Sequence, residues 1–143
     1  MKAISLWQPW ASLITIGQKR FETRSWATSY RGDLVIHAAK HWDTESYRDF
    51  YMTFFPMFAA MGITSHKQLP FGAAICMCTL ADCLPTEQVI RVIGETEKLC
   101  GNYQPNRYAW KLADIAPFDA PVPYRGAQGF FEYDYAKRKA GDQ

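Results

Sequence analysis

The sequence has no hydrophobic run long enough to cross a membrane. A spanning helix needs roughly 20 consecutive apolar residues, but the two longest apolar segments, 53–62 and 71–84, are shorter and are broken by proline, glycine or aspartate. Polar and charged residues follow the N-terminal apolar stretch closely, which argues against a secretory signal. We therefore expect a cytoplasmic protein that has no membrane partner.

The sequence also lacks the cysteine spacing of a metal site. Its four cysteines form no C-x-x-C pair, and no histidine lies close to them. In a strand, Cys76 and Cys78 would point to one face and Cys83 to the other, as small buried side chains do. Glycine-rich phosphate loops and a recognisable Ser-His-Asp spacing are missing as well. We expect reduced thiols, no metal and no cofactor.

The chain carries little net charge, but the charges are unevenly distributed. Sixteen Lys and Arg face fourteen Asp and Glu, so the net charge of +2 does not by itself indicate a polyanionic partner. Residues 1–41 carry a local charge of +4, however, whereas residues 82–97 carry −3. The basic segment also holds three of the five tryptophans. A basic stretch interleaved with aromatic residues is typical of nucleic-acid binding, although a solvated basic face would look similar.

The order of hydrophobic patterns predicts one α+β domain over residues 1–136, followed by a basic, disordered tail over residues 137–143. Alternating or continuous apolar residues predict strands at 2–6, 20–26, 34–39, 71–84, 106–116 and 129–133. Helical spacing and caps predict short helices at 9–16, 44–55, 64–69 and 86–93. Without a regular βαβ rhythm, these five or six mostly antiparallel strands and two to four helices indicate a sheet that curls into a partly open barrel.

Two of these strands have further expected features. Segment 71–84 is nearly all apolar, so we expect it to be the longest and most central strand. Three prolines after segment 106–116 predict an edge or a loop, namely Pro117, Pro121 and Pro123.

The densest polar cluster covers residues 17–24, between a helix end and a strand. Alternation places Arg20, Glu22 and Arg24 on one face of that strand, together with Trp26. Removing such charges from water costs several kcal/mol each unless they are paired. The face is therefore either a salt-bridged outer surface or the wall of a polar cleft.

This cluster resembles a known family signature. The pattern G-x-K-x-x-E-x-R of the ASCH domain (activating signal cointegrator homology) is matched by Gly17, Lys19, Glu22 and Arg24. Other segments are similar to the cointegrator-type branch of the family, namely 5–13, 24–26, 30–32, 36–39, 108–112 and 125–129. The chain thus resembles a small single-domain member of this family over most of its length.

The resemblance implies a PUA-like pseudo-barrel whose signature lines a cleft for nucleic acid or a modified nucleobase. Some small members of the family hydrolyse N4-acetylcytidine, and nuclease activity on RNA has been attributed to others. The amidohydrolase branch has a threonine nucleophile where this chain has Glu22. Because a carboxylate does not replace an activated hydroxyl, this departure argues against acetylcytidine hydrolysis.

We expect the binding residues to be aromatic and charged side chains near the signature. The candidates are Trp7, Gln8, Lys19, Glu22, Arg24, Trp26, Tyr30, Arg31 and Lys40. Trp26 is the favoured stacking platform, whereas Trp10 and Trp110 belong to core-facing stripes. Lys19 supplies a point charge and Arg24 a planar two-point donor.

Three functions remain open at this level. A binding module for RNA, single-stranded nucleic acid or a modified nucleoside uses Glu22 to hold Lys19 and Arg24 in place. A small hydrolase uses Lys19 and Glu22 as catalytic acid and base. A protein-binding adaptor uses the aromatic surface instead. His37, on an apolar strand, is expected to be a satisfied core histidine.

Overall fold

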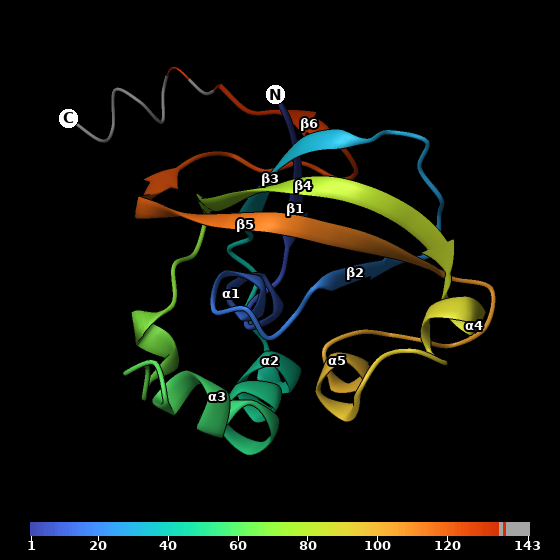
Figure 1. Ribbon diagram of the computed structural model, residues 1–143. Helices are drawn as coiled ribbons and strands as arrows, with labels where there is room; N and C mark the ends of the chain where they lie inside the picture. Colours follow the sequence, from blue (N-terminus) through green and yellow to red (C-terminus); the bar gives the residue numbers. More distant parts are fainter. Residues whose placement is uncertain (135, 137–143) are drawn as a thin grey trace.

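The computed structural model describes residues 1–134 and 136 and contains one six-stranded sheet (Figure 1). The predicted tail at 137–143 lies outside the described residues. The strand order is β2-β5-β4-β3-β1-β6, and all neighbours are antiparallel except β1 and β3. The strands are β1 (Lys2–Leu6), β2 (Phe21–Arg24), β3 (Gly32–Ala38), β4 (Ala73–Pro85), β5 (Tyr108–Pro123) and β6 (Phe131–Glu132). The α+β prediction is confirmed, and the sheet is not closed.

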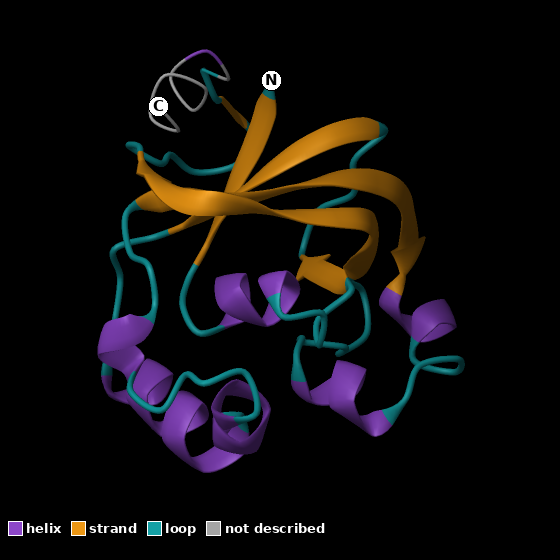
Figure 2. Ribbon diagram, turned by 60° about the vertical axis from the view of Figure 1, so that its left-hand side comes forward, coloured by secondary structure: helices purple, strands orange, loops and turns teal. Residues whose placement is uncertain are grey.

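Short helices cover one side of this sheet, as both ribbon views show (Figures 1 and 2). They are α1 (Trp10–Thr15), α2 (Thr44–Arg48), the π-helix η1 (Asp49–Thr53), α3 (Phe55–Ala59), the 3₁₀-helix η2 (His66–Gln68), α4 (Thr86–Val89) and α5 (Glu95–Leu99). Among the described residues, no helix has the length and apolarity that a membrane span needs. Helices α1 and α4 pack on the sheet, and η1 packs against α2 and α3.

Helix α1 is short because its ends are fixed by proline and glycine. Pro9 precedes it, and Gly17, at φ +83°, donates its backbone N–H to the Ile14 carbonyl at 3.0 Å. A left-handed residue after the last turn is the usual way a helix ends, and glycine adopts it without strain. The N–H groups of Gln18 and Lys19 both donate to the Leu13 carbonyl. This turn directs the chain, with Lys19, into β2.

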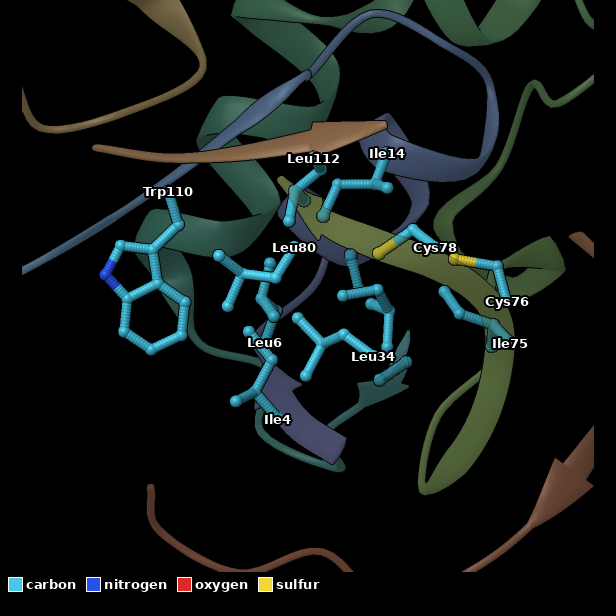
Figure 3. Packing of buried hydrophobic residues seen from close by; sticks show 13 residues of the cluster. Ile4, Leu6, Ile14, Leu34, Ile75, Cys76, Cys78, Leu80, Trp110 and Leu112 are labelled. Atoms are coloured by element: carbon cyan, nitrogen blue, oxygen red, sulfur yellow. The ribbon is translucent and has the colours of Figure 1, made fainter. Parts of the chain in front are cut away.

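The main core lies between the sheet and α1 (Figure 3). Ile4 and Leu6 of β1 meet Ile14 of α1 and Leu80 of β4, all at most 4% exposed. Trp110 of β5 closes one end of this cluster and is fully buried, which confirms its predicted core position.

The prediction that Cys83 faces away from Cys76 and Cys78 is wrong. All three pack against the same core cluster, and the four cysteines are free thiols. The cause is a register shift in β4: Leu80 pairs with Leu112, but Asp82 already pairs with Lys111. One extra residue in β4 reverses the alternation, so that the later cysteine turns to the core face.

Three further element predictions need correction. The segment predicted as one helix at 44–55 holds α2, the π-helix η1 and the first residue of α3. Pro56 has no N–H to continue the earlier helix and is tolerated in a first turn, so α3 begins next to it. Helix α5 was not predicted, because its sequence ETEKL has a single large apolar residue. Strand β4 is central as expected, but β5, with 16 residues, is longer.

Strand β5 continues through the three prolines that were expected to end it. Strand β2 pairs only with residues 108–111 of β5, so the proline-containing half has a strand neighbour on one side only. A proline is tolerated there because no second strand needs its missing N–H. The prediction of an edge was right, whereas the predicted strand end at 116 was wrong.

Candidate nucleic-acid interface

A cavity of about 1260 Å³ opens where β1, β2 and β3 end and β4 begins. Its walls are residues at or just after the ends of these strands, the bend at 71–72, and the segment 123–129, which leads from the end of β5 toward β6. We call it the larger cavity. Among the predicted binding residues, Trp7, Arg24, Trp26 and Lys40 line it.

The larger cavity is lined by positive charge. Arg24, Lys40 and Arg125 contribute to its walls, and no aspartate or glutamate does so within the described part of the chain. Lys40 lies across Gly72: a Cβ at residue 72 would come within 2.8 Å of the Lys40 Cε. A side chain at residue 72 would therefore displace the Lys40 stem from its present position. Such a wall attracts a phosphate or another anion.

Two half-exposed tryptophans stand at this cavity. Trp7 is 54% exposed, and one of its faces is covered by the His41 ring, whose centroid lies at 3.9 Å. Trp26 is 37% exposed and is held edge-on by Trp110 and Phe130, with centroid distances of 4.7 and 5.6 Å. Both indoles are thus supported by neighbouring rings while keeping surface for a ligand. Trp10, in contrast, packs as predicted against buried residues, in a second cluster that includes Leu13 and Phe50.

The inner wall of the larger cavity carries a hydrogen-bonded histidine. His37 is 3% exposed; its Nδ1 lies 2.9 Å from the Ser5 Oγ and its Nε2 lies 2.6 Å from the Tyr124 carbonyl oxygen. Burial lowers the pKa of His37, an effect that the Tyr124 hydrogen bond opposes only in part. The prediction of a satisfied histidine is confirmed. The structure adds that this histidine fastens the segment that carries Arg125 and Gln128.

The signature residues form a chain of ion pairs. Glu22 Oε1 lies 3.3 Å from the Lys19 ammonium, and Glu22 Oε2 accepts a 2.8 Å hydrogen bond from Arg24 Nε. The Lys19 side chain is only 2% exposed, and its Nζ also donates to the Cys100 carbonyl at 2.8 Å. Arg24 Nη2 donates to the Ser5 carbonyl at 3.0 Å. Glu22 therefore holds both cations, and Lys19 is a buried partner rather than a loop cation.

A smaller cavity of about 660 Å³ lies on the other side of these ion pairs. Its walls include Lys19, Glu22 and Arg107, and it shares Ser5, Trp7 and Arg24 with the larger cavity. Glu45 of α2 lines it too, so its charges are mixed. Arg24 thus stands between the two hollows and can face a ligand in either.

Three titratable groups near the smaller cavity, Glu97, Cys100 and Tyr103, are affected by burial. Burial raises the pKa of Glu97, whose Oε2 is buried without a hydrogen-bond partner in the described part of the chain, and raises the pKa of Cys100 to about 11. Burial likewise raises the pKa of Tyr103, with the Glu97 charge adding to the effect. In each case burial disfavours the charged form.

Three predicted binding residues lie outside both cavities. Gln8 is buried and bonds to Ser12 and to the Pro70 carbonyl. The Tyr30 hydroxyl donates to the Asp33 carbonyl at 2.6 Å, and Arg31 lies 3.4 Å from the Asp82 carboxylate on the surface. These side chains support the loops around the strand ends.

The sequence candidates omitted the second wall of the larger cavity. Arg125, Gly126 and Gln128 line it from the segment between β5 and β6, together with Tyr124. The segment 125–129 is one of those that resemble the family, which was the available signal. Hydrogen bonds of Tyr124 with His37 and with the Gly72 carbonyl hold this segment at the cavity, and no local pattern indicates either contact.

A family model described as the ASCH domain matches residues 4–122 of the chain. The chain belongs to the ASCH domain family. Activating signal cointegrator 1 from Homo sapiens is 35% identical over 86 residues, and the mouse protein of the same name is 34% identical over the same length. These matches cover 59% of this chain but only 15% of either cointegrator.

Solved structures agree with this family on the fold. A crystal structure of a point mutant of ASCH from Zymomonas mobilis has a TM-score of 0.58 and 14% identity, covering 99% of this chain and 95% of that one. The unmutated Zymomonas mobilis protein gives a TM-score of 0.56 with 14% identity over 96% and 90% of the two chains. The fold of this ASCH domain is therefore the PUA-like α+β fold that the resemblance implied.

Proposed function

We propose that this ASCH domain binds single-stranded RNA, or a modified nucleoside, in the larger cavity. The observation that carries the proposal is a hollow lined by three cations, two half-exposed tryptophans and, among the described residues, no carboxylate. Lys40 and Arg125 bind backbone phosphates, and Trp7 and Trp26 stack on bases. Stacking of one base on an aromatic ring contributes about 1–3 kcal/mol.

The family signature then has a supporting role. Lys19 and Glu22 are paired with each other, and Glu22 orients Arg24 through a 2.8 Å hydrogen bond. Two of the three Arg24 nitrogens are used in this way, on Glu22 and on the Ser5 carbonyl. Its Nη1 has no hydrogen-bond partner among the described residues. A guanidinium fixed on one side presents its remaining donors to a ligand with little loss of entropy.

Anisotropy titrations of a labelled eight-nucleotide single-stranded RNA test the proposal. Lys40→Ala and Arg125→Ala should each weaken binding and make its salt dependence less steep, by about 0.7 in log K against log salt for each phosphate that is no longer neutralised. Lys111→Ala and Arg91→Ala are matched controls, because both residues are exposed and line neither cavity. Wild-type affinity in both cavity variants would reject the proposed site.

Hydrolysis in the smaller cavity is a second candidate, favoured by the pairing of Lys19 and Glu22 at 3.3 Å on its wall. An acid and a base this close can transfer protons. The arrangement supports binding better, since both Glu22 oxygens already have cationic partners. Chromatography of RNA and of a nucleoside panel after incubation decides: new products that disappear with Glu22→Gln would establish catalysis.

A protein-binding adaptor is the third candidate. It is favoured if neither oligonucleotides nor nucleosides raise the melting temperature of the domain, because a ligand that binds the folded state stabilises it by mass action.

A further inference from the structure

The hydrogen bonds of His37 determine which of its nitrogens carries the proton. Nε2 lies 2.6 Å from the Tyr124 carbonyl oxygen, which can only accept. Nε2 must therefore be the N–H donor. In the neutral ring, which burial favours, the opposite nitrogen Nδ1 then has only a lone pair.

This arrangement fixes the Ser5 hydroxyl. Ser5 Oγ lies 2.9 Å from His37 Nδ1, so its single proton points to the histidine. Only the acceptor lone pairs of Ser5 Oγ remain for a ligand, and Ser5 lines both cavities. A serine that usually both donates and accepts thus becomes an acceptor.

Gly126 keeps this hydroxyl accessible. A Cβ at residue 126 would lie 3.2 Å from Ser5 Oγ and 2.7 Å from His37 Cε1, and Gly126 itself lines the larger cavity. Any side chain there would fill the space in front of the Ser5–His37 pair. The Arg24 guanidinium, which contacts the Ser5 main chain at 3.0 Å, places donors next to this acceptor.

We propose that Ser5, oriented by His37, is a specificity-determining residue that accepts a hydrogen bond from the exocyclic amino group of a nucleobase. A carbonyl at the same position of the base would face the lone pairs of Ser5 Oγ, and the Ser5 hydroxyl has no free proton to donate to it. The domain therefore selects amino-bearing bases over their carbonyl counterparts. This inference rests on the proposed function and names the class of base that the larger cavity takes.

Calorimetric or fluorescence titrations of nucleoside 5′-monophosphates test it on the wild-type protein. Cytidine monophosphate should bind about tenfold tighter than uridine monophosphate, and adenosine monophosphate about tenfold tighter than inosine monophosphate. N4,N4-dimethylcytidine monophosphate, which has lost the donor, should bind as weakly as the uridine compound. The inference would be overturned if cytidine and uridine monophosphates bound with equal affinity and adenosine and inosine monophosphates did so too.

Variants separate this role from a structural one. Ser5→Ala should abolish the preference for amino-bearing bases, and His37→Phe should reduce it by freeing the Ser5 proton to point to the ligand. Ser25→Ala is the control, because Ser25 is exposed and lines neither cavity. A preference that survives Ser5→Ala would contradict the inference, and the wild-type nucleotide series decides it even if a variant fails to fold.

The titrations distinguish failure of this inference from failure of the proposed function. If nucleotides bind, and Lys40→Ala weakens them all, but cytidine and uridine compounds bind equally, the site stands and the Ser5 role is rejected. If no nucleotide or oligonucleotide binds the wild-type protein, both are rejected.

Discussion

The two cavities of this ASCH domain share a wall but differ in charge. The larger one has Arg24, Lys40 and Arg125 on its walls and no carboxylate among the described residues. The smaller one contains Lys19 and Arg107, but also Glu22 and Glu45. Lys40 and Arg125 of the larger cavity have no ion pair among the described residues, whereas Lys19, Glu22 and Arg24 on the wall of the smaller cavity are paired with one another.

The difference shows that a family signature does not have to be the contact surface itself. Lys19 and Glu22 are nearly buried and hold each other, and Arg24 is the member that reaches the larger cavity. Removing one partner of a buried ion pair leaves the other as an uncompensated buried charge, which is strongly destabilising. Substitutions in the signature should therefore affect folding first, and substitutions across the larger cavity should affect binding.

The largest expected effect comes from breaking the buried ion pairs. Glu22→Ala leaves the ammonium of Lys19, 2% exposed, without its carboxylate, and should lower the free energy of unfolding by about 3 kcal/mol. Urea denaturation measures the change. Glu45 is an exposed glutamate on the wall of the smaller cavity. The free energy of unfolding of Glu45→Ala should stay within about 0.5 kcal/mol of the wild-type value. Equal stability of the two variants would show that the buried ion pairs of Glu22 matter no more to folding than an exposed carboxylate does.

On the larger cavity, the aromatic platform should dominate affinity. Trp7→Ala should weaken RNA binding about tenfold, because loss of one stacked base costs about 1–3 kcal/mol. Anisotropy titration measures the loss. Tyr47→Ala is the matched control, since Tyr47 is 51% exposed but lines neither cavity. If both variants bind alike, Trp7 is not a stacking platform.

A smaller effect should appear in the pH dependence of stability. The folded pKa of His37 is lowered by burial below its ordinary value of 6.5, so the unfolded chain binds this proton more readily. The contribution of neutral His37 to the free energy of unfolding is complete above pH 6.5. It is lost progressively as the pH falls toward the pKa of His37 in the folded state. Urea denaturation between about pH 7.5 and pH 5 should show a wild-type advantage over His37→Gln that shrinks with acidification. A constant difference would mean that His37 does not titrate as its burial requires.

The smallest effect on stability and on binding is expected at Arg31. This arginine forms an exposed ion pair with Asp82 at 3.4 Å. Exposed ion pairs of this kind contribute about 0–1 kcal/mol. Arg31→Ala should leave RNA affinity at the wild-type level in anisotropy titrations, unlike Arg125→Ala. A loss as large as that of Arg125→Ala would extend the binding surface beyond the larger cavity.

Local sequence features predicted the elements that depend on local forces. The cap at Asp43 and the glycine that ends α1 lie where the pattern placed them, and Glu22 and Arg24 of β2 contact each other at 2.8 Å, as expected for residues on one strand face. The strand bulge near Asp82 and the continuation of β5 through its prolines depend on which strands are neighbours, and so could not be seen in one segment.

The candidate site shows the same division. Trp7, Arg24, Trp26 and Lys40 were found from the composition of one basic segment and line the larger cavity. Arg125 was missed as a site residue because it lies far along the chain from that segment, and the Tyr124–His37 hydrogen bond brings its loop across.

Amide chemical-shift mapping during titration with single-stranded RNA tests the central claim most directly. The account predicts that the perturbed backbone amides cluster around the larger cavity, at Ala39, Gly72, Gly126 and Gly129. Perturbations confined to Gly101 and Asn102, which line the smaller cavity, would contradict it.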